Sequence, residues 1–126
     1  VELMVSLRRD PQFGLVLTMA SGGVMTEILQ DASTMLVPAN YMSLQASLSS
    51  LRMAPFFDGF RGGAPASRKA ILNQIQALVR FMLARPDIIE IEINPVIVST
   101  NSAICADALI TVVDKDDQPA ISLRHS

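Results

Sequence analysis

The stretch from Glu90 to Ile110, EIEINPVIVSTNSAICADALI, carries its polar groups at regular intervals. Glu90, Glu92 and Asn94 alternate with isoleucines, so in an extended strand the polar side chains share one face and the isoleucines share the other. Carboxylate and amide oxygens are ligands of hard cations such as Mg²⁺, which is usually bound together with substrate phosphates. The polar face of this strand is therefore a candidate cation site.

A cluster of turn residues at 99–102, STNS, divides the stretch into two strands and predicts an antiparallel hairpin. With those residues as the loop, Val98 pairs with Ala103, and Asn94 lies directly opposite Asp107. Directly opposed Cβ atoms are about 4.5 to 5.5 Å apart, which lets both side chains reach one ion. Asn94 and Asp107 are thus the predicted metal ligands.

The sequence alone does not decide whether these residues form a metal site. Pro95 is a candidate bulge position, and a slip of one residue in the pairing turns Asp107 to the other face of the sheet. The competing interpretation of Asn94 and Asp107 is an ordinary polar strand face closed by a hydrogen bond. For Glu92, which lies one step along the same face, it is a solvated charge.

The first half of the chain predicts a hairpin followed by a short helix. Segments rich in β-forming residues at 2–8 and 15–19 flank a turn and indicate two paired strands. Residues 24–29 form either a short strand or the edge of a loop. Ser43 is the candidate N-cap of a helix whose leucines recur at helical spacing up to Met53.

The second half begins with a linker rich in glycine and proline, APFFDGFRGGAPAS at 54–67, for which we expect irregular backbone. The most periodic helix follows from Arg68 and ends near Arg85, because Pro86 pushes the preceding residue out of the α region. Its apolar stripe, expected to face the core, comprises Ile71, Ile75, Leu78 and Met82, widened by Leu72, Val79 and Leu83.

Composition restricts the class of protein. The chain has 126 residues, of which 50% are hydrophobic, so it fits one compact domain or part of one. A net charge of -2 with scattered basic residues predicts no nucleic-acid partner, and the uncharged run 32–51 contains too many polar residues for a membrane span. The single cysteine, Cys105, favours a reducing compartment, so we expect a cytoplasmic protein. The start in strand-like sequence without Met indicates a piece of a longer polypeptide.

Gly22 and Gly23 are a second candidate binding position, because glycine-rich turns let a phosphate approach backbone N–H groups. The competing interpretation is a simple turn after a strand. Arg61, within another glycine-rich segment, is a further candidate for an anion contact. We expect Cys105 in the core and Arg8-Arg9 at a solvated strand end.

Five short motifs occur in order along residues 1–113: ELMVSLRRDPQFGLVL, ASGGVMTEILQD, DGFRGGAP, EIEINPVIV and ADALI. In this order and spacing they resemble the C-terminal lobe of the ATP-grasp domain of ADP-forming acyl-CoA synthetases. This is the acetate–CoA ligase group, which is related to the succinyl-CoA synthetase beta subunit. In that family ATP phosphorylates a histidine on a mobile segment, and the phosphate then passes through an acyl phosphate to give acyl-CoA.

The resemblance implies roles for individual residues. By this match Asn94 and Asp107 ligate Mg²⁺, and Glu92 assists phosphorylation of the histidine. ATP, a carboxylic acid and CoA are then the small-molecule substrates, with CoA bound by other domains of the full-length protein.

The sequence also departs from the family pattern. The family usually has glycine where Ser6 stands and another glycine near Ala20, which bears on activity more than on fold. The other ATP-grasp lobe, the CoA-binding domains and the phosphorylated histidine are absent from these residues, and His125 matches no family motif. We therefore expect the fragment alone to be inactive.

The expected fold is α+β, with an antiparallel sheet of two hairpins packed against two helices as half of an ATP-binding cleft. The alternative function is a degenerate, non-catalytic nucleotide-sensing module, such as the synthetase-like region of a protein acetyltransferase. A third is a structural or dimerising domain without affinity for Mg-nucleotide. The acyl acid, the choice of ATP or GTP and the oligomeric state stay open.

Overall fold

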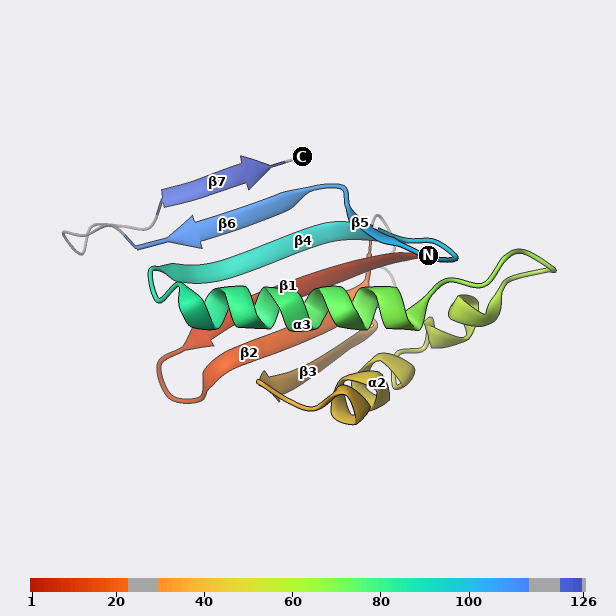
Figure 1. Ribbon diagram of the computed structural model, residues 1–126, viewed down its shortest axis with the longest axis horizontal. Coiled ribbons are helices and arrows are strands. Elements are labelled where there is room, and N and C mark those ends of the chain that lie inside the picture. Colours follow the sequence, from red (N-terminus) through yellow and green to blue (C-terminus); the bar gives the residue numbers. More distant parts are fainter. Residues whose placement is uncertain (23–29, 114–120, 126) are drawn as a thin grey trace.

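The computed structural model describes residues 1–22 and 30–113, together with the backbone of residues 121–125. Within these ranges one antiparallel sheet, ordered β3-β2-β1-β4-β6-β7 with β5 beside β4, carries the helices on one face (Figure 1). The expected α+β class is confirmed. The strands are β1 Glu2–Asp10, β2 Gly14–Ser21, β3 Ala32–Val37, β4 Ile88–Val98, β5 Ala103–Cys105, β6 Ala108–Val112 and β7 Ile121–His125.

Strands β1 and β2 form the predicted first hairpin. At its turn the Asp10 carboxylate accepts hydrogen bonds from the backbone N–H groups of Gln12 at 2.8 Å and Phe13 at 3.0 Å. Gly14 follows with φ of 86°, a left-handed conformation that glycine adopts without steric conflict. Local chemistry alone therefore closes this end of the hairpin.

The long helix α3, Arg68–Ala84, has the predicted limits. Ser67 caps it, since the Ser67 hydroxyl accepts a hydrogen bond from the Ala70 N–H at 3.0 Å. Arg85, before the proline, ends it. Leu83 lies on the predicted stripe but is 49% exposed, so that part of the prediction was wrong.

The start of helix α2, Tyr41–Ser49, differs from the prediction. Asn40 is its N-cap, because the Asn40 side-chain oxygen accepts a hydrogen bond from the Ser43 N–H at 2.8 Å. The prediction of Ser43 as the cap was therefore wrong. The helix also ends before Met53, and a 3-10 helix, η1 at Ala54–Asp58, occupies part of the linker that was expected to be irregular.

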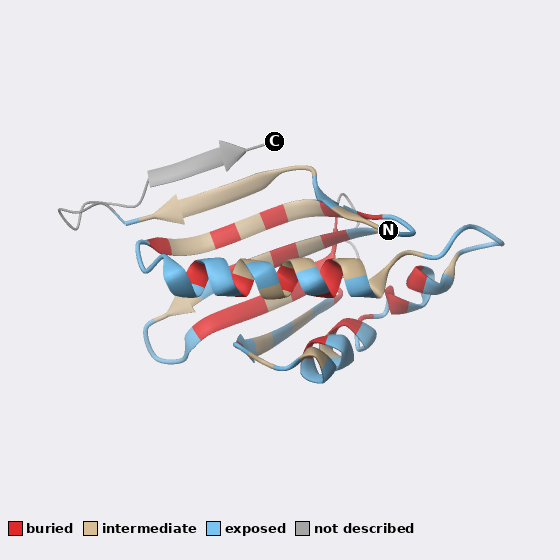
Figure 2. Ribbon diagram, in the orientation of Figure 1, coloured by how far each residue is buried: buried red, intermediate tan, exposed pale blue. Residues whose placement is uncertain are grey.

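The core lies between the sheet and the helices. Figure 2 shows buried positions recurring along the central strands and along the sheet-facing side of α3. The buried residues of α3 are Ile71, Leu72, Ile75, Val79 and Met82. Full burial of such a side chain contributes about 1.5 to 3 kcal/mol relative to leaving it exposed. This packing fixes which face of each strand points inward, and so assigns the alternate residues to the opposite face.

Arg9 ties β1 to the turn between α3 and β4. Its Nε donates to the Ile88 carbonyl at 2.8 Å, and its Nη2 donates to the carbonyls of Met82 and Arg85, the latter at 3.1 Å. The Met82 and Arg85 carbonyls lie at the end of α3, where backbone acceptors lack intrahelical partners, and the Ile88 carbonyl lies at the start of β4. The expectation that Arg9 is simply solvated was therefore wrong.

Two strands were not expected from the sequence. β3 pairs with β2 along the segment 32–37, which the sequence marks only as part of an uncharged run. β7 pairs with β6 at the other edge. Among the described residues no helix has the length and apolar character that crossing a membrane requires.

Candidate functional site

The predicted polar residues of the second hairpin line one groove. Glu92, Asn94, Asp107 and Leu109 surround a hollow of about 220 Å³, which we call the polar groove. Their neighbours Ile91 and Ile93, buried to 3% and 2% exposure, point to the helix-covered side, so the groove opens on the other face of the sheet. The structure thus brings all three predicted groove residues together.

The register of the hairpin is the one predicted. Val98 pairs with Ala103, and the Asn94 N–H donates to the Asp107 carbonyl at 3.0 Å. The turn is closed by the Ser99 N–H, which donates to the Ser102 carbonyl at 2.8 Å. Asn94 and Asp107 therefore lie directly opposite each other.

Pro95 does not disturb this pairing. Its carbonyl accepts a hydrogen bond from the Ala106 N–H at 3.0 Å, and the register is unchanged between β4 and its partners on either side of the proline. The irregularity falls instead on the pairing of β4 with β1, between Leu3 and Val5. The bulge expected near Pro95 is therefore directed toward β1 and leaves Asp107 on the groove face.

The polar groove offers oxygen ligands of the kind that a hard cation takes. Glu92 and Asp107 supply carboxylates and Asn94 supplies an amide oxygen, all on half-buried residues. No group of three or more His, Cys, Asp or Glu side chains that could hold a metal occurs in the described part of the chain. This donor set fits Mg²⁺, which keeps part of its coordination for water and substrate phosphates instead of using a complete protein cage.

Gly22 lies at a close approach between two strands. A Cβ at this position would be 2.6 Å from the Leu3 carbonyl carbon, so only glycine fits without a backbone shift. The Gly22 N–H donates to the Glu2 carbonyl at 3.0 Å, so this amide already has a backbone partner, and a phosphate contact at Gly22 stays a prediction. Gly23 lies outside the described residues.

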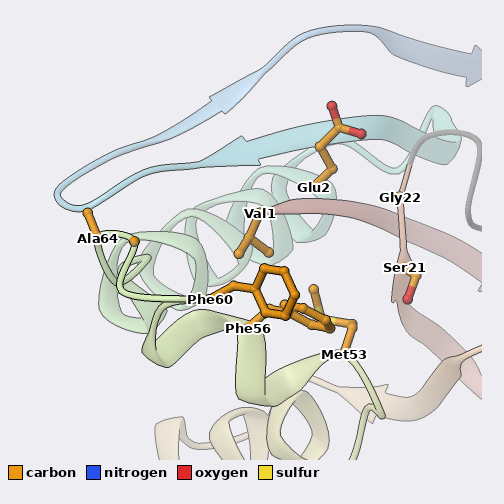
Figure 3. Close-up of a pocket in the computed structure, with 9 residues that line it drawn as sticks. Val1, Glu2, Ser21, Gly22, Met53, Phe56, Phe60 and Ala64 are labelled. Carbon is orange, nitrogen blue, oxygen red and sulfur yellow. The ribbon is translucent and has the colours of Figure 1, made fainter.

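Gly22 also lines a second and larger hollow, of about 700 Å³, which we call the apolar pocket (Figure 3). Met53, Phe56 and Phe60 form its aromatic and thioether wall, and Glu2 lies at the start of β1. The rings of Phe56 and Phe60 are tilted, with centroids 5.0 Å apart, and both residues are partly exposed. This pocket was not predicted from the sequence, although the clustered phenylalanines at 56–60 were a usable signal.

Asp31 was also missed. It is 5% exposed, and its carboxylate accepts hydrogen bonds from the N–H groups of Arg52 at 2.8 Å and Met53 at 2.9 Å and from the Ser21 hydroxyl at 3.1 Å. Burial acts to raise the pKa of Asp31, but the hydrogen bonds from Arg52, Met53 and Ser21 and the nearby charge of Arg52 together outweigh it, so the pKa lies below its ordinary value. The only sequence signal was its place as the last charge before the long uncharged run.

The Arg61 guanidinium carbon lies 5.2 Å from the centroid of the Phe60 ring, and an anion contact by Arg61 stays a prediction. Cys105 is exposed at the edge of the sheet, so its expected place in the core was wrong.

The profile of the ATP-grasp domain family matches residues 1–112. The chain belongs to the ATP-grasp domain family. The helix-free face of its sheet, with the polar groove, is thus a surface of an ATP-grasp domain.

Several curated relatives of this ATP-grasp chain are ADP-forming acetate–CoA ligases. It is 34% identical over 107 residues to the beta subunit of acetate–CoA ligase (ADP-forming) I from Pyrococcus furiosus, covering 85% of this chain and 46% of that one. It is 32% identical over 95 residues to acetate–CoA ligase (ADP-forming) I from Archaeoglobus fulgidus, covering 75% of this chain and 14% of the relative. The chain therefore spans about half, or less, of the length of these relatives.

A solved structure has the same fold. It is the dinucleotide-forming acetyl-coenzyme A synthetase 1 of Ca. Korarchaeum cryptofilum in complex with coenzyme A and Mg-AMPPCP, with its phosphohistidine segment pointing towards the nucleotide-binding site. The TM-score is 0.83 at 30% identity, and the match covers 89% of this chain and 53% of that chain. The resemblance to ADP-forming acyl-CoA synthetases is confirmed.

Proposed function

We propose that this chain is the Mg-nucleotide-binding part of an ADP-forming acyl-CoA synthetase. The complete protein joins a carboxylic acid to CoA with the consumption of ATP, by way of a phosphohistidine. The other ATP-grasp lobe and the CoA-binding domains belong to parts of the protein outside this sequence. The proposal rests on the relatives, which are enzymes of this class, and on the groove described above.

One observation carries the proposal. Two carboxylates and an amide, from Glu92, Asp107 and Asn94, line a single groove on the helix-free face of an ATP-grasp sheet. A purely structural sheet face has no need to gather three such groups around one hollow, since like charges on neighbouring positions repel. A bound cation relieves that repulsion.

The residues then have distinct roles. Asn94 and Asp107 hold Mg²⁺, which when bound supplies positive charge that offsets the charge of the triphosphate. Glu92, one position along the same face, orients the accepting imidazole or takes its proton. Gly22 contributes through its shape in the wall of the apolar pocket, because its N–H is engaged by Glu2.

A specific observation favours the alternative, a non-catalytic nucleotide-sensing module. Ser6, which stands where the family usually has glycine, pairs directly with Glu92 across β1 and β4. A side chain at that place lies beside the proposed catalytic carboxylate. Nucleotide binding without turnover in the complete protein would favour this alternative.

The test uses the complete protein and compares wild type with Asp107→Ala. We measure Mg-dependent ATP binding and acyl-CoA formation with a panel of carboxylic acids. Loss of the Asp107 carboxylate is expected to reduce turnover by about 100- to 1000-fold, as removal of one group that stabilises charge commonly does. Stability is expected to change by less than about 1 kcal/mol, because the residue is only half-buried.

Thr111→Ala is the matched control, because Thr111 lies on the same face of β6 beyond the groove. This control should keep wild-type turnover. Unchanged turnover in the Asp107 variant would overturn the metal-ligand role.

A further inference from the structure

Asp31 joins two distant parts of the chain. Asp31 directly precedes β3. Its backbone carbonyl accepts a hydrogen bond from the Ser21 N–H at 3.0 Å, and its carboxylate accepts one from the Ser21 hydroxyl. The same carboxylate accepts the N–H groups of Arg52 and Met53, which lie 21 and 22 residues further along the chain. Asp31 thus connects the end of β2 with the turn between α2 and η1.

These contacts are strong for their kind. Hydrogen bonds to an ionised group are roughly twice as strong as neutral ones, and low local polarity strengthens them further. A carboxylate buried to 5% exposure would be strongly unfavourable without them. The backbone on both sides is therefore held in one arrangement.

The two connected segments are also two walls of the apolar pocket. Ser21 and Gly22 form one wall, and Met53 contributes to the opposite wall together with Phe56 and Phe60 (Figure 3). Asp31 itself is absent from the lining, but it bonds directly to a residue in each wall. A change at Asp31 would therefore alter the spacing of the walls without removing any lining side chain.

We propose that Asp31 is a positioning residue that sets the distance between the Ser21–Gly22 wall and the Met53 wall of the apolar pocket, and thereby the affinity for Mg-ATP. This rests on the proposed function, in which Gly22 belongs to the nucleotide site. The role is carried through the neighbours of Asp31 and needs no contact between Asp31 and the nucleotide.

The experiment compares Asp31→Asn with Asp10→Asn in the complete protein. Asparagine keeps the size of the side chain but replaces one acceptor oxygen with a donor, so one backbone N–H loses its partner. Asp10 is the matched control because its carboxylate also accepts two backbone N–H groups, from Gln12 and Phe13, at the opposite end of the β1–β2 hairpin.

The first readout is the division between KM and kcat. We expect Asp31→Asn to raise the KM for Mg-ATP by about tenfold and to keep most of kcat at saturation. Tenfold is the lower end of the loss that typically follows when a residue that positions a binding group is replaced. Asp10→Asn should keep both values. Equal KM values in the two variants, or a loss confined to kcat, would overturn the proposal.

The second readout is amide hydrogen exchange, which needs no ligand. Asp31→Asn should speed exchange at Ser21, Arg52 and Met53 more than in the rest of the sheet. A uniform increase would show a general loss of stability and would also overturn the proposal. If wild type fails to bind Mg-ATP, the proposed function is wrong, and this exchange pattern still decides whether Asp31 holds the two walls.

Ser21→Ala serves if Asp31→Asn does not fold. It removes the hydroxyl that donates to the Asp31 carboxylate at 3.1 Å and leaves the bonds from Arg52 and Met53 to Asp31 in place. A smaller rise in KM and faster exchange at Ser21 are expected. An unchanged KM together with unchanged exchange would count against the proposal.

Discussion

The polar groove and the apolar pocket are assembled in different ways. The groove belongs to one hairpin, in which Asn94 and Asp107 meet because the 12 residues between them fold back on a short turn. The pocket combines the start of β1, the end of β2 and the segment 53–64, whose positions are set by contacts between distant residues. The groove depends on strand register, and the pocket depends on tertiary packing.

This difference separates two kinds of mutational effect. A groove residue points away from the core, so its replacement should affect chemistry and leave the fold nearly unchanged. A residue behind the pocket is buried among backbone groups, so its replacement should affect stability and geometry together. Variants in the two regions therefore test whether the proposed division is correct.

The largest effect is expected for Glu92→Gln, which sharpens the comparison on the groove side. The change keeps the size of the side chain but removes the base, and loss of general acid–base assistance typically costs about 100- to 10,000-fold in rate. Mg-ATP affinity and the melting temperature should stay close to wild type. Acyl-CoA formation by the complete protein measures the rate, and a normal rate would remove Glu92 from the mechanism.

Gly22→Ala tests the pocket side. The added methyl group would meet the Leu3 backbone at 2.6 to 2.8 Å, and such overpacking should destabilise the fold by about 3 kcal/mol. Thermal unfolding of the complete protein gives the loss. Gly14→Ala is the control, since a Cβ there meets nothing within 4 Å and only its φ of 86° is strained. A greater loss at Gly14 than at Gly22 would contradict the close-approach argument.

The smallest effect is expected from acid. Burial acts to raise the pKa of Asp31, but its hydrogen bonds and the charge of Arg52 together outweigh burial, so the pKa is lowered in the fold. Its contribution to stability is therefore present above the unfolded-state pKa of about 3.9 and is lost as the pH falls through the lower folded value. Melting temperatures between pH 7 and pH 3 should fall less steeply in Asp31→Asn than in wild type. Parallel curves would show that Asp31 contributes nothing to acid sensitivity.

The features that the sequence predicted correctly are those set by local rules. Alternation along β4, together with a four-residue turn, gave the pairing of Asn94 with Asp107. The end of the glycine- and proline-rich linker predicted the start of α3, and Pro86 predicted its end. These signals act within one turn or one hairpin, so no knowledge of distant contacts is required.

The features that were missed depend on distant partners. Strand β3 is half exposed, and its extended conformation depends on pairing with β2. The hydrogen-bond partners of the Asp31 carboxylate lie 10 to 22 residues away in the sequence. At the start of α2, Asn40 and not Ser43 is the N-cap, because the Asn40 side chain accepts a hydrogen bond from the Ser43 N–H. At Cys105 hydrophobic character suggested the core, but β5 is a short strand at the edge of the sheet.

Arg9 has a consequence for how the molecule opens. One guanidinium fastens the last turn of α3 and the first residue of β4 to β1, so none of the three elements can detach alone without leaving donors or acceptors unmatched. Strand, helix and strand should therefore melt as one cooperative unit. The hairpin that carries the groove is joined to this unit through Ile88, the first residue of β4, and should open together with it.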